Sequence, residues 1–111
     1  MIVKTYGVFD TIAEECIKII TSKNDDTAKR AVEYIVREKD FDKIAGRDYV
    51  LEHLYDFDTE SRLIVDNSVH VVANFGQALA AFEAEQQLAK AQELIASLPK
   101  KEEQPSLEAQ E

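Results

Sequence analysis

The sequence is poor in the residues that cross-link small domains and in those that build phosphate-binding loops. Its 111 residues include one cysteine, Cys16, so an internal disulfide cannot form, and this suits a reducing compartment. The three glycines lie apart, at positions 7, 46 and 76, which argues against a glycine-rich phosphate loop. No apolar run approaches the roughly 20 residues that span a bilayer, and the N-terminus does not resemble a signal peptide. We therefore expect a cytoplasmic protein without membrane contact.

Basic residues are also scarce. The chain has 13 lysines and arginines against 22 acidic residues, and its net charge is −9. The acidic excess lies from Tyr49 onward, whereas the first half is near balance. Nonspecific nucleic-acid binding depends on lysine and arginine displacing counterions from phosphates. The charge therefore disfavours nucleic-acid binding by the whole chain, and any such contact must come from the first half.

The first half reads as two strands followed by a helix. Residues 2–9 are β-branched and aromatic, with Tyr6 on one face and Phe9 on the other, and residues 16–21 read as a second strand. Helical spacing within residues 12–20 leaves a helix open as the alternative there. Asn24 can cap a helix, and apolar residues then recur at the spacing of a helix with one buried side, as far as about residue 38. These apolar residues are Ala28, Ala31, Val32, Ile35 and Val36.

A hairpin is predicted next. Residues 49–57 read as a strand, residues 58–61 as a turn and residues 62–65 as the partner strand, with residues 69–73 as a possible continuation. We expect one face of the first strand to carry Leu51, His53, Tyr55 and Phe57. The fold class is therefore α+β: a small antiparallel sheet in β-β-α-β-β order with one packed helix, over residues 1–73.

A long C-terminal helix is expected over residues 74–98, started by Asn74 with Gln77 as a capping pair. One apolar stripe is expected to dock on the domain and consists of Phe75, Leu79 and Phe82. A second stripe, on the opposite side, has heptad-like spacing and suggests an oligomer interface through Leu88, Ala91, Ile95 and Leu98. The alternative is that this half folds back or frays. Residues 99–111 are expected to form a flexible tail.

Catalytic and metal sites have little support. The acids of residues 56–60 alternate like the start of a calcium loop, but Ser61 stands where that loop needs glycine. His53 and His70 each lack a nearby second ligand, so ordinary strand histidines are favoured over an acid/base pair. Cys16 lies in an apolar stretch, which favours a buried, inert thiol. We expect no enzyme activity, no metal and no cofactor.

A basic and aromatic face is the one candidate nucleic-acid site. Lys23, Lys29 and Arg30 lie near the helix start, and Tyr6 and Phe9 lie on the first strand. Together they could contact a single strand. A solvated helix face over core aromatics explains the same residues.

Three short segments resemble the small nonstructural protein of gokushovirus-type microviruses, which are phages with single-stranded circular DNA. The resemblance covers roughly residues 4–65, whereas the alanine- and glutamine-rich helix after Asn74 lies outside it. Tyr55 and Ser61 depart from it because glycine is usual at both positions. The residues that carry the resemblance are Tyr6, Val8, Phe9, Asp10 and Ala13, then Asn24, Asp25, Ala28 and Arg30, then Asp48, Tyr49, Leu51, Leu54, Phe57 and Asp58.

The resemblance implies a non-virion protein with a part in genome replication or packaging, and it supplies no catalytic residues. The leading hypothesis is a homo-oligomeric phage accessory protein in the host cytoplasm that acts on single-stranded DNA or with viral or host replication proteins. Its expected DNA contacts are Lys23, Lys29, Arg30 and Arg37. The alternatives are a protein-interaction adaptor or acidic inhibitor without DNA contact, and a small enzyme with a site shared between subunits.

Overall fold

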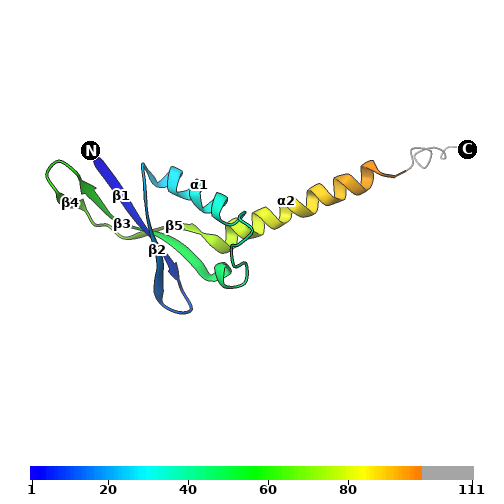
Figure 1. Ribbon diagram of the computed structural model, residues 1–111, viewed down its shortest axis with the longest axis horizontal. Helices are drawn as coiled ribbons and strands as arrows, with labels where there is room; N and C mark the ends of the chain where they lie inside the picture. Colours follow the sequence, from blue (N-terminus) through cyan, green and yellow to red (C-terminus); the bar gives the residue numbers. More distant parts are fainter. Residues whose placement is uncertain (99–111) are drawn as a thin grey trace, which may run out of the picture.

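The computed structural model describes residues 1–98. It shows an antiparallel sheet, a short helix packed on one face of the sheet, and a long helix that projects away (Figure 1). This confirms the predicted α+β class, and the possible continuation at residues 69–73 forms a fifth strand. The elements are β1 (Ile2–Asp10), β2 (Glu15–Ser22), α1 (Asp25–Ile35), the 3₁₀ turn η1 (Ala45–Asp48), β3 (Tyr49–Asp58), β4 (Leu63–Asp66), β5 (His70–Asn74) and α2 (Phe75–Ala96).

The sheet is built around β1 and β3. Its order is β2-β1-β3-β4, all neighbours are antiparallel, and β5 also pairs with β3. β4 pairs with residues 56–58 of β3 and β5 with residues 50–53, so the two short strands follow one another along the same edge. The predicted break at residues 66–68 is the point where the chain passes from β4 to β5.

A β-bulge interrupts the pairing of β1 with β3. Tyr6 lies opposite His53 and Thr5 lies opposite Tyr55, so Leu54 is an extra residue on β3. A bulge of this kind changes which residues of the strand point to which face. Before Leu54 the odd-numbered residues of β3 face α1, and after it the even-numbered ones do.

The prediction of which β3 residues share the buried face is therefore correct for two of the four. Leu51 and His53 are buried as expected, at 0% and 1% exposure. Beyond the bulge it is Asp56, rather than Tyr55 or Phe57, that shares their face, and Asp56 is buried. The prediction assumed an unbroken two-residue alternation, which the bulge removes.

α1 forms as its sequence predicts. The side chain of Asn24 accepts a hydrogen bond from the amide of Thr27 at 2.8 Å, which satisfies one of the free amides of the first turn. Ala28, Val32 and Val36 are buried against the sheet at the predicted helical spacing. They pack on the face of β1 that carries Tyr6 and Val8 and on Leu51 of β3.

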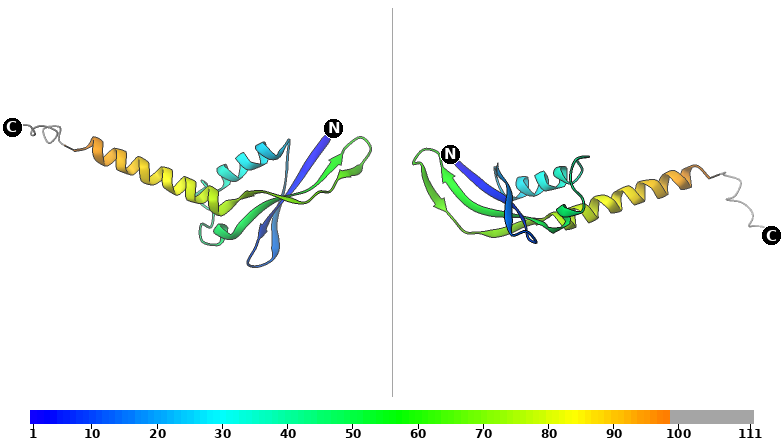
Figure 2. Two further views of the ribbon diagram at one scale, coloured as in Figure 1. Left: turned by 180° about the vertical axis from the view of Figure 1, so that it is seen from behind. Right: turned by 60° about the horizontal axis from the view of Figure 1, so that its bottom comes forward.

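α2 docks only by its first turns. Asn74 caps it by accepting from the amide of Gln77 at 3.1 Å. Phe75 and Leu79 are fully buried, which confirms the docking stripe, and Phe82 is partly buried. Every residue of 84–98 is exposed, so the helix projects from the domain and the fold-back alternative is wrong (Figure 2). Within residues 1–98 no helix is both long and apolar enough to cross a membrane.

Two expectations for β1 and β2 are wrong. Cys16 is exposed rather than buried, because it lies opposite Phe9 on the face of the sheet away from α1. Tyr6 is fully buried on the face under α1, so it cannot join Phe9 and the α1 basic residues in one surface.

Candidate functional site

Three ring side chains form a row across the face of the sheet that α1 covers. Tyr6 of β1, His53 of β3 and His70 of β5 are register partners across neighbouring strands. The Tyr6 and His53 rings meet edge to face, with centroids 5.5 Å apart. The two histidine rings are stacked, with centroids 5.0 Å apart. Two histidines far apart in the sequence are thus brought into contact by strand pairing.

Asp25, the first residue of α1, joins the two ends of this row. The Tyr6 hydroxyl donates to its Oδ1 at 2.6 Å, and Nε2 of His70 lies 3.0 Å from its Oδ2. These two hydrogen bonds lower the pKa of Asp25. Burial, together with the same bond to Asp25, raises the pKa of Tyr6 and keeps it a neutral donor. Asp25 therefore fastens the start of α1 to β1 and β5.

Asp56 and Lys4 continue the network on the other side of His53. One oxygen of Asp56 lies 2.6 Å from Nε2 of His53 and the other accepts from Nζ of Lys4 at 2.9 Å. Burial tends to raise the pKa of Asp56, but the bonds from His53 and Lys4 outweigh it, so the pKa is lowered. The hydrogen bond to Asp56 raises the pKa of Lys4. We call Lys4, Tyr6, Asp25, His53, Asp56 and His70 the charged row.

The hydrogen bonds of His53 favour its charged form. Nδ1 lies 2.7 Å from the carbonyl oxygen of Ser68, and Nε2 lies against the carboxylate of Asp56. Both oxygens only accept while Asp56 is ionised, so each bond needs an N–H on the ring. Burial lowers the pKa of His53, but the bonds to Asp56 and Ser68 reverse this, so the pKa is raised. Below this raised pKa, His53 and Asp56 form a buried imidazolium–carboxylate pair.

The contribution of the His53–Asp56 pair to stability is expected to be largest in mildly acidic solution. The raised pKa of His53 stabilises the fold below its ordinary value of 6.5, and this contribution is lost as pH rises through the folded-state value. The lowered pKa of Asp56 stabilises the fold above its ordinary value of 3.8, and this is lost as pH falls. Urea unfolding at several pH values should therefore show the pair's contribution largest between these limits.

The matched comparison is the His53→Leu/Asp56→Leu variant, which removes both charges. We expect the wild type to lose stability relative to this variant when the pH is raised from 6 to 9. A constant difference across that range would show that His53 does not carry the charge.

The charged row has few of the features that catalysis requires. His53 is 1% exposed and both of its nitrogens are engaged, so it has no free position for a substrate proton. Tyr6 is fully buried and its raised pKa disfavours the phenolate. Within residues 1–98 no group of three or more histidine, cysteine or acidic side chains is placed to hold a metal ion. The hydrogen bonds of the charged row hold α1 and β5 on the sheet.

Comparison with known protein families places the chain. Residues 3–80 match the phage ORF5 protein family, which covers every strand, α1 and the docked start of α2. The chain belongs to this phage protein family. No curated protein and no solved structure matches the chain. The projecting part of α2 lies beyond the match, so any role of that segment has to be argued from its own residues.

Two of the predicted DNA-contact residues lie side by side on this phage protein. Lys29 and Arg30 are both exposed on the outer side of α1. They share that surface with Asp26 and Glu33, and the four side chains line one shallow hollow. The surface is therefore of mixed charge rather than strongly basic.

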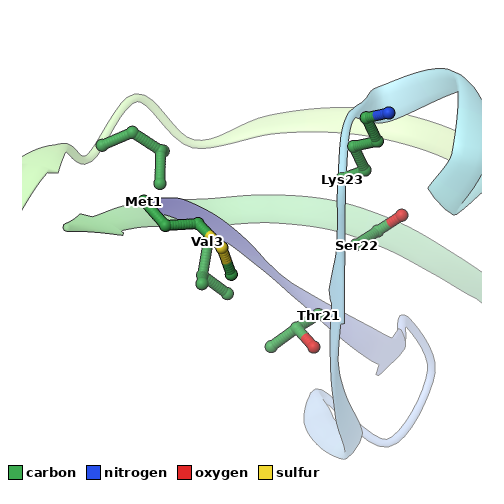
Figure 3. A pocket seen from close by; sticks show the side chains of 6 residues that line it. Met1, Val3, Thr21, Ser22 and Lys23 are labelled. Atoms are coloured by element: carbon green, nitrogen blue, oxygen red, sulfur yellow. The ribbon is translucent and has the colours of Figure 1, made fainter. Parts of the chain in front are cut away.

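Lys23 lies at the corner between β2 and α1. It borders an open hollow of about 580 Å³ between the start of β1 and the end of β2 (Figure 3). The pairing of β1 with β2 begins at Lys4, so the first residues of β1 lie free of β2 there. The hollow is lined by Met1, Ile2, Val3, Thr21, Ser22 and Lys23.

Arg37 has a different environment. Its guanidinium donates to both oxygens of Glu85, at 2.9 and 3.1 Å, and lies 4.9 Å from the ring centroid of Phe82. Arg47 makes a similar bond to Glu83 at 3.1 Å. Arg37, which was predicted to contact DNA, thus links α2 to the end of α1.

The predicted oligomer seam lies on the projecting half of α2. Leu88 is 59% exposed, Ile95 67% and Leu98 50%, and Ala91 between them is also exposed. Leu94, beside the seam, is 66% exposed. No described residue outside the helix covers these side chains. A helix with an uncovered apolar stripe is typical of an interface.

Proposed function

We propose that this phage protein is a non-enzymatic accessory factor of a small single-stranded DNA phage of the microvirus type. It acts in the host cytoplasm as a homo-oligomer, in genome replication or packaging. The family match supports a phage protein, and the resemblance of residues 4–65 supports the microvirus assignment. The observation that carries the proposal is the undocked half of α2.

The undocked half of α2 needs a partner to be stable. Isolated helices shorter than about 12–15 residues are marginal in water, and residues 84–96 have no packing of their own within the described chain. In a paired helix, Leu88 and Ile95 would take the a positions and Ala91 and Leu98 the d positions. The flanking positions include Gln87 and Gln92, so two copies meet there without like-charge repulsion. A second α2 is the simplest cover.

Charges in the seam should separate the copies. We expect Leu88→Asp/Ile95→Asp to lower the associated mass in sedimentation velocity, because each copy would bring two carboxylates into the seam, where they would lose water and face the carboxylates of the other copy. The run is made at tens of micromolar protein. Relative to the wild type, the association constant of the variant should be at least about a hundredfold lower, which corresponds to about 2.7 kcal/mol.

The matched control is Gln86→Asp/Ala89→Asp, which puts the same charges on the opposite side of α2. It should leave the sedimentation coefficient unchanged. Equal loss of association in both variants would point to a helix weakened by aspartate, and no change in either would contradict the seam.

DNA contact is proposed through Lys23, Lys29 and Arg30, with Arg37 supporting α2. Three cations among acidic neighbours bind phosphates weakly in one copy. An oligomer offers several such patches to one strand, and linked weak sites gain affinity through effective concentration. Self-association and DNA contact are thus parts of one mechanism.

The mixed charge of this surface favours one alternative, a protein-interaction adaptor or acidic inhibitor. Asp26 and Glu33 flank Lys29 and Arg30, and the guanidinium of Arg37 is hydrogen-bonded to Glu85. On this reading α2 or the acidic surface binds a viral or host protein, and the chain does not touch DNA. Titration of a labelled single-stranded oligonucleotide separates the two functions.

A further inference from the structure

The face of the sheet away from α1 is an apolar surface. Residues directly opposite in an antiparallel pair point to the same side, so the register assigns each side chain to a face. Ile19 is 53% exposed there, Val71 61% and Ile64 58%. We call this surface the open face. Thr5 and Gly7 of β1 also point to this side but are buried under their neighbours, and the surface itself is formed by Val3 and Phe9 of β1, Cys16, Ile19 and Thr21 of β2, Val50, Glu52, Tyr55 and Phe57 of β3, Ile64 of β4 and Val71 of β5.

At the centre of the open face, two apolar side chains occupy the space above Gly7. A Cβ atom at Gly7 would lie 2.6 Å from Cε2 of Phe9 and 3.2 Å from Cδ1 of Leu54. These two side chains therefore lie over the glycine, and Leu54 is the extra residue of the β3 bulge. Sheets that pack face to face do so through apolar side chains that interdigitate between them.

The low charge of the open face favours a second copy of the chain over DNA as its binding partner. Glu52 is the one charged side chain among its residues, although the chain carries a net charge of −9. A polyanion such as DNA would find no cation there to neutralise its phosphates. Two copies of an acidic protein repel one another least where they expose the least charge. The open face meets that condition.

Within residues 1–98, neither helix covers the open face. α1 packs on the other face of the sheet, and α2 leads away from it (Figure 2). The sequence after residue 98 contains one large apolar residue, Leu107, among charged and polar ones, so its composition does not suit an apolar sheet face. A second copy does suit it, because the same apolar surface is present on each.

We propose that the open faces of two copies pack against each other around a two-fold axis and form a second interface, separate from the α2 seam. Two different self-complementary contacts on one chain join more than two copies. The assembly would then present the Lys29 and Arg30 surfaces outward, on the sides of the sandwich away from the shared core. The proposal deepens the homo-oligomer proposed above, and its test separates the two interfaces.

The experiment is sedimentation velocity on four full-length proteins. They are the wild type, the seam variant Leu88→Asp/Ile95→Asp, the open-face variant Ile19→Arg/Val71→Arg, and the combination of both pairs. We expect the wild type to exceed a dimer, the seam variant to remain a dimer, and the combined variant to be a monomer. The control for the arginines is Ile12→Arg/Ile44→Arg, which changes exposed isoleucines in two turns and should leave the mass unchanged.

Each outcome assigns one interface. A monomeric seam variant would overturn the open-face interface and leave the α2 oligomer standing. A monomeric open-face variant together with an unaffected seam variant would support the open face and overturn the seam. Each variant is expected to fold, because all substituted side chains are about half exposed or more. Circular dichroism checks this for each one.

Discussion

Replacing Asp56 with alanine should lower the free energy of unfolding by about 3 kcal/mol, since removing one partner of a buried ion pair leaves the other charge uncompensated. His53 is 1% exposed and has no other carboxylate within hydrogen-bonding distance among the described residues. Lys4 also loses its partner, but its side chain is 30% exposed and water can replace the bond. Urea unfolding followed by circular dichroism at pH 6 measures the loss.

Two comparisons separate the charge pair from general damage. Asp40→Ala, in an exposed turn, should change the unfolding free energy by less than about 0.5 kcal/mol. His53→Leu/Asp56→Leu should lose less than Asp56→Ala alone, because it removes both charges. If the double variant were the less stable, the pair would be stabilising in itself and the argument from an uncompensated charge would be wrong.

The Phe75→Ala variant should lose about 4 kcal/mol, in the range found for truncating a buried phenylalanine. Phe75 is 1% exposed and lies where α2 leaves the sheet. Its ring centroid is 6.1 Å from that of Phe41 and 5.9 Å from that of Tyr49. The variant therefore removes the anchor that sets the direction of the projecting helix. Urea unfolding measures the change in stability.

Leu88→Ala is the control for this helix. Leu88 is 59% exposed and lies on the undocked half, so in dilute protein the substitution should cost under about 0.5 kcal/mol. A loss as large as that of Phe75→Ala, measured where the protein is monomeric, would mean that the second half of α2 also packs on its own domain.

The helices were predictable because their information is local. The capping side chains of Asn24 and Asn74 and the spacing of Val32 and Leu79 are set within a few residues, and the structure confirms them. The succession of the first four strands along the chain was predictable in the same way, from turn residues and runs of β-branched residues. The apolar seam of α2 was also readable, because helical spacing fixes which side chains share a side.

The charged row was not predictable because it depends on register. His53 meets His70 only because β5 pairs with the first half of β3, and Asp56 faces inward only because Leu54 forms a bulge. The sequence around Leu54 does not predict a bulge, because residues 49–58 contain neither glycine nor proline. The exposure of Cys16 likewise depends on which face of β2 is uncovered. These are properties of the whole sheet.

The proposed DNA-contact residues show a similar limit. Sequence grouped Lys29, Arg30 and Arg37 by their shared helix, and the structure keeps the first two together. Arg37 is drawn to Glu85, which lies far along the chain on α2. Long-range ion pairs of this kind cannot be counted from one helix alone.

Contact of this acidic protein with single-stranded DNA is tested most directly by fluorescence anisotropy of a labelled single-stranded oligonucleotide. We expect binding at low salt that weakens as salt rises, with a slope in log K against log salt of about −2 for each copy whose Lys23, Lys29 and Arg30 contact the strand. Lys29→Glu/Arg30→Glu should abolish this binding, whereas Lys39→Glu/Lys43→Glu, with the same charge change in the following loop, should weaken it less. A flat titration of the wild type at low salt, with protein in large excess, would contradict DNA contact and leave the adaptor function.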